Sequence, residues 1–257
     1  MTDWGEAAEH MVTPVHTIHE AERLATAERR MNELGVSALP VVDDTGQLGG
    51  VITKRDLLRI GRIRGVGRER LLDLPDQRLR EHASAPLELV GRTAKVAEVA
   101  RRMVRRKVHH VYVAQGRMVE GVISTREIMR VVSDHELERS AAEVVGGPAL
   151  TVSRDEPLGL ALDRLATSGH RELVVLDAGS PVGIFDQLEA VSARDASARI
   201  PVEEWMSPAI TCVPPELAVH RAAALAASAG SRAVVVTDGS ELRGILTGLE
   251  FAALLAA

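Results

Sequence analysis

The chain has 257 residues, 46% hydrophobic and 26% charged, which is enough for one large domain or two smaller ones. Its formal net charge of −5 disfavours non-specific nucleic-acid binding, which needs a basic surface. The single cysteine, Cys212, excludes an intrachain disulfide and a multi-cysteine metal site, and we expect it to be a small core residue of a strand.

Residues 1–6 are polar and acidic, which predicts no signal peptide. The sequence contains no uninterrupted apolar run near the ~20 residues that a membrane helix needs. We therefore expect a cytoplasmic protein that does not enter a membrane.

The first predicted helix, residues 20–34, repeats apolar side chains near a period of 3.6 and ends at Gly35. Residues 39–42 (Leu-Pro-Val-Val) predict a buried strand, and an Asp-Asp-Thr-Gly hairpin turn follows it. Residues 50–56 read Gly-Val-Ile-Thr-Lys-Arg-Asp, which is typical of a strand that gives way to a helix.

The same elements recur three times further along the chain. Residues 61–70, rich in Gly and Arg, predict a linker between the first and second copies. Helices of the third and fourth copies are predicted at residues 157–168 and 215–229, ending at Gly169 and Gly230. The opening glycine, Gly50, has counterparts at Gly121, Gly183 and Gly244. Further predicted strands lie at residues 111–113, 173–176 and 234–236, and lead-in segments at residues 11–18, 85–90, 148–152 and 206–213.

Each copy follows the order strand, helix, strand, turn, strand, helix over roughly 60 residues. This pattern resembles the CBS domain, the regulatory repeat named after cystathionine β-synthase. The resemblance implies an α/β fold of four CBS-type β-α-β-β-α repeats paired into two Bateman modules, residues 1–135 and 140–257. It implies repeats at about residues 5–60, 79–133, 140–193 and 200–255, a linker at 61–78, and a flat disc formed within the chain or by a homodimer.

The end of the strand at Thr53 is the first candidate site. A helix N-terminus offers unpaired N–H groups and the positive end of a dipole, which suits a phosphate. The Thr53 hydroxyl can donate to a phosphate oxygen, Lys54 and Arg55 add positive charge, and the Asp56 carboxylate can accept from two ribose hydroxyls. The resemblance implies the same roles for Thr53 and Asp56, and it places the base near Val15, His16, Ala38 and Pro40.

A second interpretation stays open, because Ser/Thr-x-x-Asp/Glu at a helix start is also a capping box. Ser124 with Glu127 and Thr247 with Glu250 fit the box fully, so these residues, with Arg126, are weaker nucleotide candidates. The box prefers Glu at its last position, and the Asp56 of the first copy therefore favours a nucleotide role.

In the second copy, His109, His110 and Tyr112 lie around the position of Leu39-Pro40-Val41 of the first. Tyr112 can stack on a base with His110 as a neighbour, or it can be a half-buried strand residue whose hydroxyl meets water. A metal site at His109 and His110 is disfavoured, because no further His or Cys lies near them in the sequence and carboxylates would have to supply the other ligands.

The third copy has Asp186 where the first has Thr53. A carboxylate there accepts hydrogen bonds and repels a phosphate, so we expect it to cap the following helix instead. In the fourth copy Gly248 and Leu249 replace Lys54 and Arg55, so we expect no adenosine phosphate to bind the second module as it binds the first.

These features predict a regulatory protein rather than an enzyme, because no nucleophile–base pair, metal cluster or Walker loop appears and no residues remain for a catalytic domain. We expect it to sense AMP, ADP or ATP and to signal to a protein partner, which the sequence does not identify, by a population shift. No catalytic cofactor is expected. A ligand-free scaffold and a sensor of S-adenosylmethionine or a cyclic dinucleotide are the alternatives. The basic run at residues 101–107 is interpreted as the solvated side of a helix rather than as a contact for nucleic acid or polyphosphate.

Overall fold

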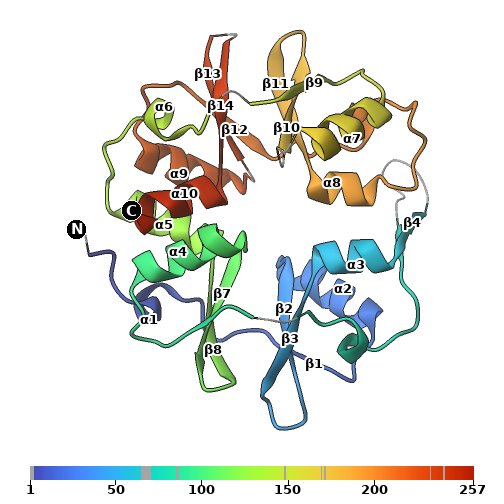
Figure 1. Ribbon diagram of the computed structural model, residues 1–257, viewed down its shortest axis with the longest axis vertical. Coiled ribbons are helices and arrows are strands. Elements are labelled where there is room, and N and C mark those ends of the chain that lie inside the picture. The colour runs from blue at the N-terminus through green and yellow to red at the C-terminus, as the bar shows by residue number, and fades with distance from the viewer. Residues whose placement is uncertain are drawn as a thin grey trace.

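The computed structural model contains four similar units around a common centre (Figure 1). The structure describes residues 3–64, 71–84, 87–147, 149–168, 170, 172–231, 233–239 and 241–257. Several expected features lie wholly or partly outside these residues, namely the lead-in residues Ala85, Pro86 and Pro148, the helix-ending Gly169, and residues 65–70 of the predicted linker.

The first and second units alternate strands and helices as the sequence predicts. The first contains β1 (Ile18–His19), α2 (Leu24–Leu34), β2 (Ala38–Val42), β3 (Leu48–Thr53) and α3 (Lys54–Ile60). The second contains β6 (Leu89–Val90), α4 (Val96–Arg106), β7 (His110–Gln115), β8 (Met118–Ser124) and α5 (Thr125–Asp134).

The third and fourth units repeat this order. The third contains β9 (Thr151–Ser153), α7 (Leu158–Thr167), β10 (Glu172–Asp177), β11 (Ser180–Asp186) and α8 (Gln187–Ser192). The fourth contains β12 (Ile210–Val213), α9 (Val219–Ala229), β13 (Ala233–Asp238), β14 (Glu241–Thr247) and α10 (Gly248–Ala256).

Every unit builds the same three-stranded sheet. The middle strand pairs in parallel with the strand before the helix and antiparallel with the strand after the hairpin. Parallel pairing needs a crossover, and the helix between the first two strands supplies it. The predicted α/β fold of four β-α-β-β-α repeats is therefore confirmed.

The repeats are joined in pairs, because the short helix or turn that opens each repeat packs on the other repeat of its pair. Helix α1 (Ala7–His10) opens the first repeat but packs on the second, where the Ala7 amide donates to the Ala94 carbonyl at 2.8 Å. The turn η2 (Leu79–Glu81) makes the reverse exchange, and the Leu79 amide donates to Glu22 at 2.9 Å. Helix α6 (Ala141–Val144) and turn η3 (Val202–Glu204) exchange in the same way between the third and fourth repeats.

The recurring glycine has its physical reason in this exchange. A Cβ on Gly50 would lie 2.8 Å from the Cβ of Ala83, and one on Gly121 would lie 2.7 Å from the Cγ of Met11. Gly183 faces the Ser207 carbonyl in the same way. Without a side chain, these glycines let the opening segment of the other repeat in the pair cross the strand in close contact with its backbone.

The exchange also moves helix boundaries from their predicted positions. The first helix starts at Leu24 rather than residue 20, because the preceding residues bond to the sister segment; the Leu24 amide, for example, donates to the Gln77 carbonyl. The helix predicted from residue 215 likewise begins at Val219, after a bridge between Ala218 and Ser140. Both helices end as predicted, at Gly35 and Gly230 in the left-handed region.

The predicted linker contains an antiparallel ribbon of β4 (Arg62–Arg64) and β5 (Leu71–Asp73), in which backbone pairing satisfies polar groups that composition does not reveal. One other expectation is wrong. Cys212 is exposed rather than buried, since β12 is an edge strand and turns this side chain away from the core.

The apolar core is divided unevenly among the repeats. One continuous cluster joins the second and fourth repeats through α4, α5, α9 and α10, while the first and third repeats each have a separate, smaller cluster. No helix in the described part of the chain is long and apolar enough to cross a membrane.

Candidate functional site

Thr53 and Asp56 form a complete capping box at the start of α3. The Thr53 backbone N–H donates to Asp56 Oδ2 at 2.9 Å, and the Asp56 N–H donates to Thr53 Oγ1 at 3.1 Å. The two side chains also bond directly, with 2.6 Å between Thr53 Oγ1 and Asp56 Oδ2. The Thr53 hydroxyl proton is thus already committed to a carboxylate and is not available to a phosphate in this conformation.

The box leaves one oxygen of the carboxylate unused. Both bonds that the Asp56 carboxylate accepts reach Oδ2, and Oδ1 receives no hydrogen bond from any residue that the structure describes. Lys54 is exposed and forms no ion pair with a described residue, whereas Arg55 has a partner of its own. The start of α3 therefore offers an acceptor at Asp56 and, two residues before it, the exposed cation of Lys54.

The strand pairing brings only part of the predicted base site to this point. Ala38 lies directly opposite Thr53 across β2 and β3, and Pro40 lies opposite Val51. Val15 and His16 precede β1, and strand pairing begins only at Ile18. His16 is exposed and Val15 partly exposed.

In the second repeat the aromatic candidate is enclosed. Tyr112 is only 3% exposed, and its hydroxyl has no hydrogen-bond partner among the described residues. Burial raises the pKa of this phenol, so it is a neutral donor. The interpretation that placed the hydroxyl in water is wrong, because the side chain and its hydroxyl are buried.

His110 pairs with Ser124 across β7 and β8. Part of the residue reaches the surface, yet its ring is surrounded closely enough that burial, with the charge of His109 as a smaller cause, lowers its pKa to about 4. The imidazole is therefore neutral at pH 7 and brings no positive charge to a phosphate.

The Ser124–Glu127 pair is a closed cap. Glu127 Oε2 accepts the Ser124 N–H at 2.9 Å, while Oε1 pairs with Arg130 at 3.3 Å. Glu127 is 6% exposed, so both of its oxygens are engaged in buried or half-buried surroundings. Arg126 remains exposed beside them.

The two repeats of the second half also form caps. Asp186 accepts the Leu188 N–H at 2.5 Å, and its own N–H donates to Glu189, as expected for a capping residue. Thr247 bonds to Glu250 through both its N–H and its hydroxyl.

Gly248, the first residue of α10, lies against Thr125 of α5. A Cβ at Gly248 would lie 2.6 Å from Thr125 Oγ1. The starts of α5 and α10 therefore close on each other.

The corresponding place between the first and third repeats is open. A cavity of about 390 Å³ lies between α2, α3 and the β4–β5 ribbon on one side and α8 with the η3 turn on the other. Lys54 lines it, whereas Thr53 and Asp56 do not. Sequence reasoning missed this cavity because Leu57, Leu58 and Leu188 have the pattern of ordinary core positions.

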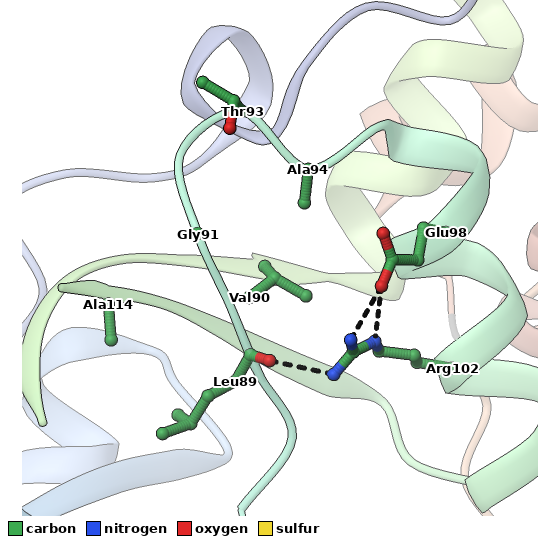
Figure 2. Close-up of a pocket in the computed structure, with 8 residues that line it drawn as sticks. All are labelled: Leu89, Val90, Gly91, Thr93, Ala94, Glu98, Arg102 and Ala114. Carbon is green, nitrogen blue, oxygen red and sulfur yellow. Dashed lines mark hydrogen bonds and ion pairs between the residues drawn. The ribbon is translucent and has the colours of Figure 1, made fainter. Parts of the chain in front are cut away.

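A wider hollow of about 530 Å³ lies on the second repeat between β6 and the start of α4 (Figure 2). Arg102 reaches across it to Glu98 at 2.6 Å and to the Leu89 carbonyl at 2.9 Å. Its charges satisfy one another and none of the predicted site residues lines it, so we do not assign the nucleotide to this hollow. Arg106 is likewise paired with Glu88, at 3.3 Å, which ties part of the basic run of α4 into local ion pairs.

The four repeats, joined in pairs, define a class of protein built from paired β-α-β-β-α units. The CBS domain family matches residues 7–62, 79–134 and 202–256, more than half of the chain, and this chain belongs to that family. The third repeat, between the last two matches, has the same strand and helix order. The chain is thus a CBS-domain protein with Bateman modules.

One solved structure is similar to this chain in fold, and two further proteins are similar to it in sequence. Protein MJ1225 of Methanocaldococcus jannaschii, described as a candidate archaeal homolog of g-AMPK, superposes with a TM-score of 0.75 at 15% identity over 98% of this chain and 100% of its own. Hypoxic response protein 1 of Mycobacterium tuberculosis is 26% identical over 56% of this chain and 96% of its own length. An uncharacterized 33.4 kDa protein in a ribosomal RNA operon of Thermofilum pendens is 23% identical over 66% of this chain, and the match spans 56% of that relative.

Proposed function

We propose that this protein is a regulatory sensor that binds an adenine nucleotide, AMP, ADP or ATP, at the first repeat of its first module. We take residues 1–135 and 140–257 as the two modules. The observation that carries the proposal is Oδ1 of Asp56, which receives no hydrogen bond from a described residue. It belongs to the helix start at Thr53, which pairs across the strands with Ala38, and the exposed Lys54 of this start has no ion pair with a described residue.

The capping box and the nucleotide role are compatible in this arrangement. Oδ2 of Asp56 holds the box while Oδ1 accepts the ribose hydroxyls, in bonds strengthened by the charge of the carboxylate. Because the Thr53 hydroxyl is committed to Asp56, the first contact with phosphate falls to Lys54. Ala38, Pro40, Val15 and His16 would border the base.

The proposed mode of action is regulatory rather than catalytic. A ligand that binds one arrangement of the repeats better than another shifts their populations by its differential affinity. The second module is proposed not to hold an adenosine phosphate in this way, because Asp186 accepts hydrogen bonds where Thr53 stands and adds a negative charge.

The test is calorimetric titration of the full chain with AMP, ADP and ATP, in wild type and in Asp56→Asn. The substitution keeps the size of the side chain but removes the charge, and we expect it to weaken binding by roughly tenfold or more. Glu250→Gln is the matched control, since it alters the same capping box in the fourth repeat and should leave affinity unchanged.

Circular dichroism of both variants separates loss of binding from loss of fold. Equal affinity of wild type and Asp56→Asn would overturn the assignment of the site. Wild type that binds S-adenosylmethionine or a cyclic dinucleotide but no adenine nucleotide would change the ligand, and a chain that binds none of them would be a scaffold.

A further inference from the structure

Helix α3 carries the proposed nucleotide contact in its first turn, and it is short. It has seven residues, and Asp56 is the third of them. Isolated helices shorter than roughly 12 residues are marginal in water, because starting a helix costs more than a few hydrogen bonds return. The position of Asp56 therefore depends on the contacts that hold α3 from outside.

The end of α3 receives a hydrogen-bond donor from the second module. Helices α2 and α9 each end at a left-handed glycine whose N–H bonds to carbonyls of the same helix. Gly61, at the end of α3, is extended, and its N–H reaches the Leu57 carbonyl alone. The next carbonyl, that of Leu58, accepts from Nη1 of Arg194, which lies just after α8. A side chain of the third repeat thus completes the end of a helix of the first.

Asp195 supports this contact from both sides. Its Oδ1 accepts from Arg62, two residues after the end of α3, at 2.7 Å. Its Oδ2 lies 3.4 Å from Nε of Arg194, so the carboxylate also orients the guanidinium that reaches Leu58. The Arg194 side chain is 29% exposed, which limits the competition of water for these bonds.

Apolar packing alone does not fix α3 against its neighbour. Helices α3 and α8 lie side by side (Figure 1). A cavity of about 390 Å³ nevertheless separates Leu57 and Leu58 from Leu188. Side chains that border a cavity lose contacts on that side, and the empty space leaves room for the helix to shift. The corresponding helices α5 and α10 belong instead to one continuous apolar core.

We propose that Arg194 and Asp195 of the second module are positioning residues for the nucleotide site of the first module. By holding the end of α3 they keep its first turn, and with it Oδ1 of Asp56, in place opposite Ala38 of β2. A contact that is already in place binds more tightly, because the cost of ordering it is not paid on binding. This inference rests on the proposed function and gives the second module a part in it without a phosphate site of its own.

The same contacts would carry the signal in the opposite direction. A nucleotide that holds the first turn of α3 favours the arrangement in which Arg194 holds its end, and linkage makes this effect reciprocal. Occupancy of the first module would thereby tighten the contact with α8 of the second module.

Calorimetric titration of the full chain with AMP, ADP and ATP tests the positioning role. Arg194→Met removes the donors but keeps a long side chain, and it should weaken nucleotide affinity by roughly threefold or more. Arg194→Lys retains one donor and should recover part of the loss. Asp195→Asn should give a smaller loss in the same direction. Arg59→Met is the matched control, because Arg59 is exposed on the same helix and its loss should leave affinity unchanged.

Hydrogen exchange tests the contact itself and does not depend on a ligand. Without nucleotide, the amides of residues 57–61 should exchange roughly fivefold faster in Arg194→Met than in wild type, the equivalent of one hydrogen bond. Added nucleotide should slow the exchange of the α8 amides in wild type but not in Arg194→Met. A merely structural role of Arg194 would not produce this second difference.

Unchanged exchange of α3 in Arg194→Met would overturn the proposed contact. Faster exchange with equal nucleotide affinity in wild type and Arg194→Met would overturn the positioning role. Should Arg194→Met not fold by circular dichroism, Asp195→Asn decides by the same two measurements. Wild type that binds no adenine nucleotide would refute the proposed function and the positioning role with it, while exchange would still decide whether the second module holds α3.

Discussion

The two places where the modules meet use the same repeat unit in opposite ways. Between the second and fourth repeats, Ala222, Ala223, Ala226 and Ala252 are fully or almost fully buried and let helices approach closely around Phe251. Between the first and third repeats, the contacts include an Arg62–Asp195 ion pair at 2.7 Å and a bond from Arg194 to the Leu58 carbonyl.

Helix length accounts for much of this difference. Helices α5 and α10 have 10 and 9 residues, whereas α3 and α8 have 7 and 6. A shorter helix buries fewer apolar side chains, and burial is the main favourable term at such contacts. The same topology thus gives one closed joint, formed by α4, α5, α9 and α10, and one open seam, between α3 and α8, that contains a cavity.

The largest expected loss of stability comes from removing a buried side chain of the closed joint. Phe251→Ala removes a ring that is 1% exposed and should lower the free energy of unfolding by about 3–5 kcal/mol. Leu58→Ala at the seam should cost about 2 kcal/mol, at the low end for such a change, because its neighbours already border a cavity. Urea unfolding followed by circular dichroism compares the two, and equal costs would contradict the asymmetry.

A smaller loss of stability is expected when a methyl group is added between the helix starts of the closed joint. Gly248→Ala places a methyl group against Thr125 and should destabilise the chain by about 1–3 kcal/mol, although alanine favours the helix itself. Lys54→Ala, at the equivalent first residue of α3, should stay within about 0.5 kcal/mol because this position is exposed. Urea midpoints measure both, and recovery of stability on adding Thr125→Gly to Gly248→Ala would identify the contact.

The smallest effect is expected at the ion pair of the seam. The Arg62 side chain is 70% exposed, so Arg62→Gln should cost less than about 1 kcal/mol, and raising the salt concentration should remove the difference. Thermal unfolding at low and high salt is the measurement. A loss as large as that of Phe251→Ala would mean that this pair, rather than the apolar core, holds the modules together.

The sequence predicted the repeat, its element order and the helix ends, because these depend on local periods and on Gly35 and Gly230. It missed the helix starts at Leu24 and Val219. Each start is determined by backbone hydrogen bonds to a segment more than fifty residues away in the chain. The burial of Tyr112 and the exposure of Cys212 were also missed, because a strand pattern does not state what covers each face of a sheet.

The candidate site likewise combines features that the sequence predicted with features that depend on tertiary contacts. Thr53-x-x-Asp56 as a helix start, and the caps at Ser124, Asp186 and Thr247, followed from four-residue motifs whose hydrogen bonds are local. Whether a carboxylate keeps a free oxygen depends on its neighbours: Glu127 meets Arg130, and Asp56 meets no such partner among the described residues. The sequence by itself determined the fold class and the capping motif at each helix start. Only the tertiary structure decided which helices close on each other and where a cavity remains, because close packing depends on the summed shapes of surfaces that are distant in the chain.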